Sequence, residues 1–180
     1  MPKKYEKISE EIVHQNRSWK YKHDVYKCNE VQYDYYYGET TGVAIIVPIL
    51  DDGRIVLIRQ YRYLQDRSGI EFPAGVISEG ETPLQGAMRE LKEETGLESS
   101  NFSKIGEFEP SQGFLKNRSH VFLANEILSQ SATTSLDPTE DIEVIFRRPD
   151  EINEMIKRGE IWSGQTLATW TLIRDFIDKK

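Results

Sequence analysis

The chain of 180 residues has few of the residue types from which several kinds of site are built. Its single cysteine, Cys28, excludes an intramolecular disulfide and a multi-cysteine zinc site. The three histidines, His14, His23 and His120, are not spaced like metal ligands. The longest apolar run, residues 42–50, is too short to cross a bilayer, and the first residues contain no apolar export segment. We therefore expect a cytoplasmic protein with no membrane partner.

Basic residues are also in deficit. The chain has 23 Lys and Arg against 30 Asp and Glu, a net charge of −7, so a nucleic-acid partner is not expected. The acidic excess is concentrated: residues 71–110 hold nine acids and three bases, and 3 − 9 gives −6. Such a run is either a solvated acidic face or a cation site, and the spacing of the acids has to decide between them.

The hydrophobic pattern predicts an interleaved arrangement of strands and helices. Residues 19–37 are typical of two strands, because tyrosines alternate with other residues in the second half. Two β-branched runs, 43–50 and 54–61, flank Asp52-Gly53, which predicts a hairpin. Further strands are expected at 103–107, 120–125 and 142–146, helices at 83–94, 150–157 and 165–177, and loops at 72–75 and 129–138. The order favours an α/β (α+β) sandwich, with an N-terminal β-hairpin region at 1–41 and one larger domain at 42–180.

The helix at 83–94 carries the densest group of acids. Thr82 with Gln85 predicts a capping box, and Gly96 predicts the helix end. The helical period places Leu84, Ala87, Met88 and Leu91 on a stripe that we expect to be buried. Glu90, Glu93 and Glu94 fall together on another face, where their mutual repulsion would become binding if they held a divalent cation.

These residues belong to a longer pattern. A glycine is followed after five residues by Glu, and after seven more by Arg-Glu-apolar-any-Glu-Glu-any-Gly-apolar. The fixed positions are Gly75, Glu81, Arg89, Glu90, Glu93, Glu94 and Gly96. The segment resembles the Nudix box of the Nudix hydrolases. That resemblance implies an α/β/α sandwich with a mixed central sheet, and hydrolysis of a nucleoside diphosphate linked to another moiety, with Mg²⁺ or Mn²⁺ as cofactor.

The resemblance also implies a role for each box residue. Glu90 and Glu94 correspond to direct metal ligands, with Glu93 supporting them or binding a further ion, and Glu93 and Glu94 are the catalytic glutamates. The backbone carbonyl of Ala74 would be another ligand. Glu81 and Arg89 correspond to a structural pair that braces the loop and the helix, and Gly75 and Gly96 complete the structural positions of the box.

A wider resemblance, from about residue 42 to 175, is to the ADP-ribose and nucleoside-diphosphate-sugar pyrophosphatases. It implies that Arg62 contacts a phosphate and that Glu71 contributes to substrate binding, although a strand arginine can also be a plain surface residue. The segment 114–117 departs from the group, because Asn117 stands where an acid is frequent. Glu140 is the best match to a later glutamate that orients or deprotonates the attacking water, with Asp137 and Asp141 as alternatives; all three can also be solvated loop acids.

We therefore predict that the chain is a Mg²⁺-dependent pyrophosphatase that converts ADP-ribose, or a related nucleotide sugar, into a nucleoside monophosphate and a sugar phosphate. Dinucleoside polyphosphates and GDP-sugars are rival substrates, and a non-catalytic domain that senses a nucleotide sugar is the rival of another class. We expect the N-terminal tyrosines to pack within the strands or at a homodimer interface. In similar enzymes this region also helps to hold the base.

Overall fold

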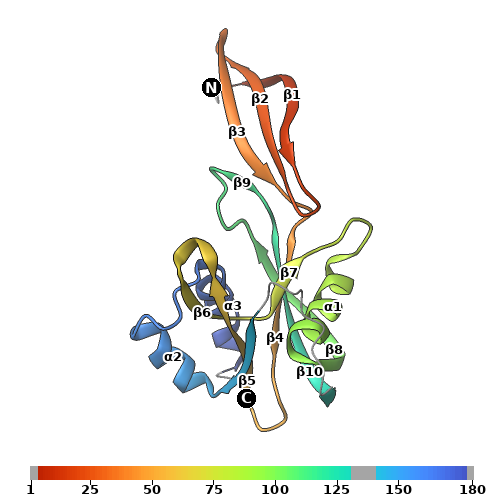
Figure 1. The fold of residues 1–180 in the computed structure, drawn as a ribbon, viewed down its shortest axis with the longest axis vertical. Coiled ribbons are helices and arrows are strands. Elements are labelled where there is room, and N and C mark those ends of the chain that lie inside the picture. Colours follow the sequence, from red (N-terminus) through yellow and green to blue (C-terminus); the bar gives the residue numbers. More distant parts are fainter. Residues whose placement is uncertain (1–3, 131–140, 178–180) are drawn as a thin grey trace.

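The computed structural model describes residues 4–130 and 141–177. A narrow N-terminal sheet extends from one end of a larger body that contains all three helices (Figure 1). The strands are β1 Tyr5–Gln15, β2 Lys20–Cys28, β3 Val31–Glu39, β4 Val43–Pro48, β5 Ile55–Arg62, β6 Arg67–Glu71, β7 Ala74–Val76, β8 Leu97–Phe108, β9 Leu115–Lys116, β10 Ser119–Gln130 and β11 Ile142–Arg147. The helices are α1 Pro83–Thr95, α2 Pro149–Lys157 and α3 Gly164–Ile177, with a 3₁₀ turn at Tyr63–Gln65.

The N-terminal sheet has the order β1-β2-β3-β9. The two strands expected at 19–37 are present as β2 and β3, but β1 precedes them and was not predicted. Every residue of β1 is exposed, and its sequence lacks the apolar alternation that marks a half-buried strand. The short strand β9 comes from the larger domain and pairs with β3 in parallel, so the ladder crosses the boundary expected near residue 41.

The body contains two further sheets, one of order β7-β4-β10-β8 and one of order β11-β5-β6. The prediction of a hairpin at Asp52-Gly53 is correct for the turn and wrong for the two strands that flank it. Gly53 has a φ of 81° and donates to the Leu50 carbonyl, but only one bridge, Ile49 to Ile55, joins the two arms. Beyond that bridge β4 and β5 separate into different sheets, because each strand is apolar on both faces and needs neighbours and cover of its own.

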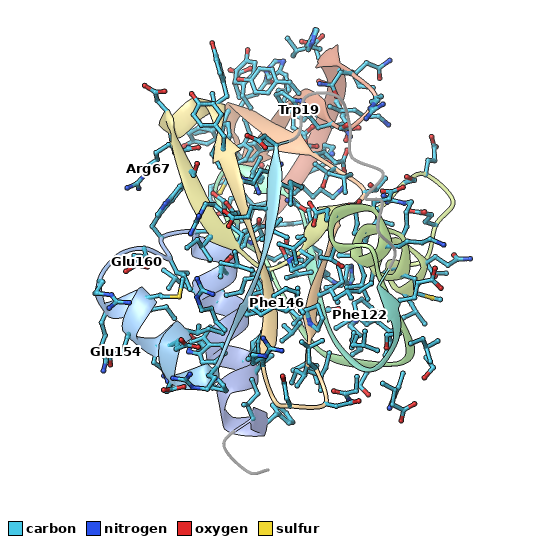
Figure 2. All side chains as sticks on the ribbon, turned by 60° about the horizontal axis from the view of Figure 1, so that its bottom comes forward. Trp19, Arg67, Phe122, Phe146, Glu154 and Glu160 are labelled. Atoms are coloured by element: carbon cyan, nitrogen blue, oxygen red, sulfur yellow. The ribbon has the colours of Figure 1, made fainter. Side chains whose placement is uncertain are left out.

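The core lies on both sides of β4. Val43, Ile45 and Val47 pack with residues of α2 and α3, whereas Ala44 and Ile46 pack with residues of α1. Phe122, which is buried, and Phe146, which is partly buried, pack on the α1 side, and Figure 2 labels both near the middle of the molecule. The result is the α/β/α sandwich with a mixed central sheet, since β4 is parallel to β10 and antiparallel to β7.

The remaining differences concern the ends of elements. The segment 72–75 is not wholly a loop, because Ala74 and Gly75 belong to β7, which pairs with β4. Strands β8 and β10 are longer than expected, and most of the expected loop 129–138 lies outside the described residues. Within the described part of the chain, no helix is long and apolar enough to cross a membrane.

Candidate active site

Helix α1 begins and ends as its sequence predicts. The Thr82 side chain accepts from the backbone N–H of Gln85, and the Gln85 side chain accepts from the backbone N–H of Thr82. Gly96 ends the helix in the left-handed region, with a φ of 70°, where a residue without Cβ is favoured. These two caps fix which thirteen residues are helical, and therefore the relative positions of the carboxylates.

The buried face of α1 differs from the predicted stripe. Ala87 and Leu91 are fully buried, but Leu84 is 41% exposed and Met88 is 49% exposed. The buried face is instead rotated toward Glu90 and Glu94, which are 9% and 4% exposed. The physical reason is that the segment 74–77 covers this side of the helix: the Ala74 N–H donates to Glu94, Gly75 lies against Glu90, and Arg89 supplies the polar partner of Glu90.

Arg89 joins the loop to the helix. Its Nε and Nη2 donate to the two carboxylate oxygens of Glu81 at 2.9 and 3.0 Å, and Nη2 also donates to the Val76 carbonyl at 3.0 Å. The remaining nitrogen, Nη1, contacts Glu90 at 2.6 Å and Glu93 at 3.0 Å. The Arg89 guanidinium lowers the pKa of Glu81 to about 2, so this carboxylate is ionised at neutral pH. The geometry is that of a brace.

Two box glutamates contact the backbone of Ala74 and Gly75. The Glu94 carboxylate accepts from the backbone N–H of Ala74 at 2.9 Å. The Glu90 carboxylate lies directly against the Cα of Gly75, so that a Cβ at this position would overlap it. Any other residue at 75 would displace Glu90, which is a steric reason for the glycine at this place in the motif.

A divalent cation would suit this group of oxygen donors. Among residues 4–130 and 141–177, no three acidic, histidine or cysteine side chains form a cluster that would hold a metal ion alone. Mg²⁺ commonly takes only one or two carboxylates and fills its shell with waters and substrate phosphates. Glu90 and Glu94, fixed by Gly75 and Ala74, with the half-exposed Glu93 beside them, fit such a partial ligand set.

The predicted substrate residues Arg62 and Glu71 form a pair. Arg62 donates from Nε to Glu71 at 2.9 Å and from Nη2 at 2.5 Å, a two-point contact that fixes the plane of the guanidinium. Glu71 is 8% exposed, whereas the Arg62 side chain is 39% exposed. The more accessible member of the pair is therefore the cation, as a phosphate contact requires.

The pair lies on the side of the body that α1 covers. Side chains alternate along β5, so Val56 and Arg62 share one face of the strand, and Val56 packs with Ala87 and Leu91 of α1. Glu71 precedes Ala74 by three residues in the chain. The Arg62–Glu71 pair thus lies on the face of β5 that packs toward α1, the helix that carries the box glutamates.

The candidate water-orienting residues are not placed in this group. Glu140 and Asp137 lie outside the described residues. Asp141 is exposed and directly precedes β11. Asn117 is buried and accepts from the Thr40 hydroxyl at 3.0 Å, which ties the loop before β10 to the end of β3. In this structure Asn117 therefore has a packing role.

One neighbour of the site was missed in the sequence. The ring of Trp162, from the segment between α2 and α3, lies beside the Glu71 carboxylate at Gly69. The sequence suggests only a core or interface anchor for this tryptophan. No local pattern connects two residues so far apart in the chain, so only the tertiary structure brings them together.

Comparison with known proteins agrees with the fold and with the motif. The family model described as NUDIX domain matches residues 40–170. An ADP-ribose pyrophosphatase of Bacillus subtilis is 33% identical over 125 residues, which cover 69% of this chain and 68% of that protein. A methanol dehydrogenase activator of Bacillus methanolicus is 32% identical over 126 residues, or 70% and 68% of the two chains. A GDP-mannose pyrophosphatase of Escherichia coli is 34% identical over 138 residues, or 73% and 72%.

A solved structure, the crystal structure of an ADP compounds hydrolase, superposes with a TM-score of 0.84. The alignment covers 98% of this chain and 95% of that one, at 20% sequence identity, and so establishes the likeness of fold. The sandwich, the capped box helix and the family match together define the class: the chain belongs to the Nudix hydrolase family. It is an enzyme related to ADP-ribose and ADP-compound pyrophosphatases.

Proposed function

We propose that this enzyme hydrolyses ADP-ribose, or a related nucleoside diphosphate sugar, to a nucleoside monophosphate and a sugar phosphate, and that it requires Mg²⁺ or Mn²⁺. The observation that carries the proposal is the contact of Glu90 with Gly75 and of Glu94 with the Ala74 N–H, together with the Arg62 guanidinium that Glu71 orients. Diphosphate hydrolysis of this kind requires oxygen ligands for a cation, and it benefits from a guanidinium that binds a phosphate oxygen.

Each residue has a defined part in this proposal. Glu90 and Glu94, with Glu93 and the Ala74 carbonyl, would hold the cation. When bound, it would neutralise the diphosphate and lower the pKa of a coordinated water. Arg62 would bind a phosphate oxygen while Glu71 keeps its guanidinium in one plane. Glu140 remains our candidate for orienting or deprotonating the attacking water.

The test compares Glu94→Gln with the wild type on ADP-ribose, GDP-mannose, UDP-glucose and diadenosine tetraphosphate in the presence of Mg²⁺. We expect kcat to fall by about 10²-fold or more, because a metal ligand loses its charge. The fold should persist, because the amide oxygen of Gln can still accept from the Ala74 N–H.

A matched control is Glu98→Gln. Glu98 lies just beyond the same helix and forms an exposed ion pair with Lys92 at 2.7 Å, so its loss should leave kcat unchanged. If the wild type binds nucleotide sugars but hydrolyses none of them, the proposed hydrolase activity is wrong and the chain is a domain that senses nucleotide sugars. Full activity of folded Glu94→Gln would instead refute the assignment of the ligand.

A GDP-sugar is the second candidate substrate, favoured by the 34% identity with a GDP-mannose pyrophosphatase. The two candidates share the diphosphate and differ in the base and the sugar. The same panel decides between them through kcat/KM, since only contacts to the base and the sugar can separate these substrates.

We further propose that the enzyme works in the cytoplasm as a homodimer joined through its N-terminal strands. Exposed apolar and aromatic side chains on this sheet support the proposal, among them Ile8, Ile12, Val13, Tyr33 and Tyr36. Light scattering coupled to size-exclusion chromatography should give twice the mass of the chain. A monomer at micromolar concentration would contradict the dimer without affecting the proposed chemistry.

A further inference from the structure

Two arginines face each other at the end of the β5–β6 hairpin. Arg62 and Arg67 are directly paired in the antiparallel ladder, so their side chains project from the same face. Like charges at such a position repel each other and are unfavourable unless something offsets the repulsion. Glu71 offsets the charge of Arg62, as described above. Arg67 has a different kind of partner.

Arg67 stacks on an aromatic ring. Its guanidinium carbon lies 4.1 Å from the centre of the Trp162 ring, close enough for a cation–π interaction. Among the described residues, no carboxylate forms an ion pair with Arg67. A π face attracts a cation but carries no net charge, so Arg67 keeps its full positive charge at the exposed rim of the molecule, where Figure 2 shows its side chain.

Gly69 provides the space for this stack. Arg67, Gly69 and Glu71 alternate along β6 and share one face. A Cβ on Gly69 would lie 2.9 Å from a Glu71 oxygen and 3.0 Å from the Trp162 ring, so any larger residue would push the two apart. The Trp162 ring N–H also donates to the Ser68 carbonyl at 3.3 Å. The ring is therefore held between the Arg67 guanidinium and the side of the strand that carries Glu71.

The four side chains form one series at the end of the β5–β6 hairpin. Arg67 stacks on Trp162, Trp162 and Glu71 both lie close to Gly69, and Glu71 pairs with Arg62. In the chain, two residues separate Glu71 from Ala74, whose N–H donates to Glu94. Two guanidiniums with one carboxylate between them leave a net charge of +1 here. This positive rim lies next to a strongly acidic box, where a phosphate group would find both a cation and hydrogen-bond donors.

We propose that Arg67, held in place by Trp162, is a second guanidinium that binds a phosphate group of the nucleoside diphosphate substrate beside Arg62. The inference rests on the proposed function and adds a residue to its binding site. Arg67 acts on substrate binding, while the chemical step depends on the box glutamates. Loss of Arg67 should therefore raise KM and leave kcat nearly unchanged.

The experiment uses Arg67→Gln, with Arg59→Gln as the matched control. Arg59 lies on the neighbouring strand β5 and on the opposite face of the hairpin from Arg67, where it forms an exposed ion pair with Glu143 at 2.6 Å. On the best substrate of the panel, Arg67→Gln should raise KM about tenfold, the value of one hydrogen bond to a charged group, with kcat changed less than twofold. Arg59→Gln should match the wild type in both constants.

A binding measurement separates this inference from the proposed activity. Calorimetric titration with α,β-methylene-ADP and Mg²⁺ should show about a tenfold weaker Kd for Arg67→Gln. Trp162→Leu should weaken binding in the same direction, because Arg67 loses the surface that positions it. This titration reports on Arg67 even if none of the four panel substrates is hydrolysed, in which case only the proposed function fails.

The contrary result is equally specific. If Arg67→Gln lowers the melting temperature but leaves both KM and the Kd for α,β-methylene-ADP at wild-type values, Arg67 only fastens the α2–α3 segment to the hairpin. The inference would then be wrong, while the proposed hydrolysis would stand on the panel. An equal loss of affinity in Arg59→Gln would also overturn it, because the effect would then be one of general charge.

Discussion

The N-terminal sheet and the central sheet have similar backbones and opposite environments. All eleven residues of β1 are exposed, whereas all six residues of β4 are buried. The central sheet is covered by helices on both faces and is stabilised by burial of aliphatic side chains. The N-terminal sheet stands away from that body (Figure 1) and has no helix on either face.

The N-terminal sheet is stabilised by contacts between aromatic rings and by ion pairs on its surface. Tyr26 stacks on Tyr33 with ring centres 5.5 Å apart and also contacts Tyr5 and Tyr35. Lys22 is only 7% exposed and pairs with Glu39 on one side and Glu10 on the other. These carboxylates raise the pKa of Lys22 well above its usual range. The comparison shows that a sheet without a core can be ordered by cross-strand pairs, each of small energy.

The largest expected effect sharpens this contrast in stability. Leu91→Ala removes a fully buried side chain from the body and should lower the free energy of unfolding by about 2–5 kcal/mol. Ile12→Ala on β1, where the side chain is 49% exposed in the single chain, should change it by less than about 0.5 kcal/mol when the protein is dilute enough to be monomeric. Urea unfolding measures both. At concentrations where the proposed dimer forms, the loss in Ile12→Ala should become larger, and comparable losses in the dilute monomer would contradict the contrast between the two sheets.

The second prediction concerns the brace at the box. Glu81→Gln should cost about 1–3 kcal/mol at pH 7, because Arg89 loses a charged two-point partner in a half-buried place. The pKa of Glu81 is lowered from 4.5 to about 2 in the folded protein. Its contribution is therefore complete above pH 4.5 and is lost as the pH falls toward 2.

The check is urea unfolding of Glu81→Gln and the wild type at pH 7 and at pH 3. The difference in unfolding free energy between them should shrink at pH 3. If this difference in unfolding free energy is the same at both pH values, the hydrogen bonds and size of the side chain at position 81 matter, and its charge does not. Glu98→Gln again serves as the exposed control.

The smallest effect is a pH dependence confined to the N-terminal sheet. His23 lies between two carboxylates, Glu11 of β1 at 3.0 Å and Asp34 of β3 at 2.7 Å, and stacks on Tyr36 at 4.3 Å. The carboxylates raise the pKa of His23 above 6.5, with Glu11 as the larger cause. The added stability is thus complete below pH 6.5 and disappears as the pH rises through the higher folded-state value.

Amide exchange measures this effect. Protection factors in the β1–β2 ladder should be higher at pH 6 than at pH 8.5 in the wild type, and equal at the two values in His23→Gln. Amides of β4 should show no such dependence, because β4 lies in the aliphatic core. A dependence that persists in His23→Gln would assign the effect to another group.

The sequence predicted the elements that depend on local chemistry. The capping box at Thr82 and the glycine stop at Gly96 define α1 because both act within one turn of the chain. The pairing of Glu81 with Arg89 was implied by the resemblance to the Nudix box, and the structure contains this contact. The two N-terminal strands of 19–37 were also predicted, because tyrosine alternation is a local signal.

Other features depended on neighbours distant in the chain. The helical period placed Leu84 and Met88 inside, but the segment 74–77 covers a different side of α1, so Glu90 and Glu94 are buried instead. The Asp52-Gly53 turn predicted a hairpin, but the paired partners of β4 are β7 and β10. In both cases the local element, a helix or a turn, formed as predicted. The segments that pack against it then decided which face is buried and which strands pair.

The sequence by itself indicated the family through the resemblance of residues 75–97 to the Nudix box, and residue type with helical spacing sufficed to group the carboxylates on α1. The sequence could not say that the Glu90 carboxylate rests on Gly75, or that Trp162 joins Arg67 to the Arg62–Glu71 pair. The Trp162 contacts join elements that are remote in the chain, and the contact of Glu90 with Gly75 depends on how β7 packs against α1. Tertiary packing therefore decided which charges of an acidic chain are neutralised and which remain available to a substrate.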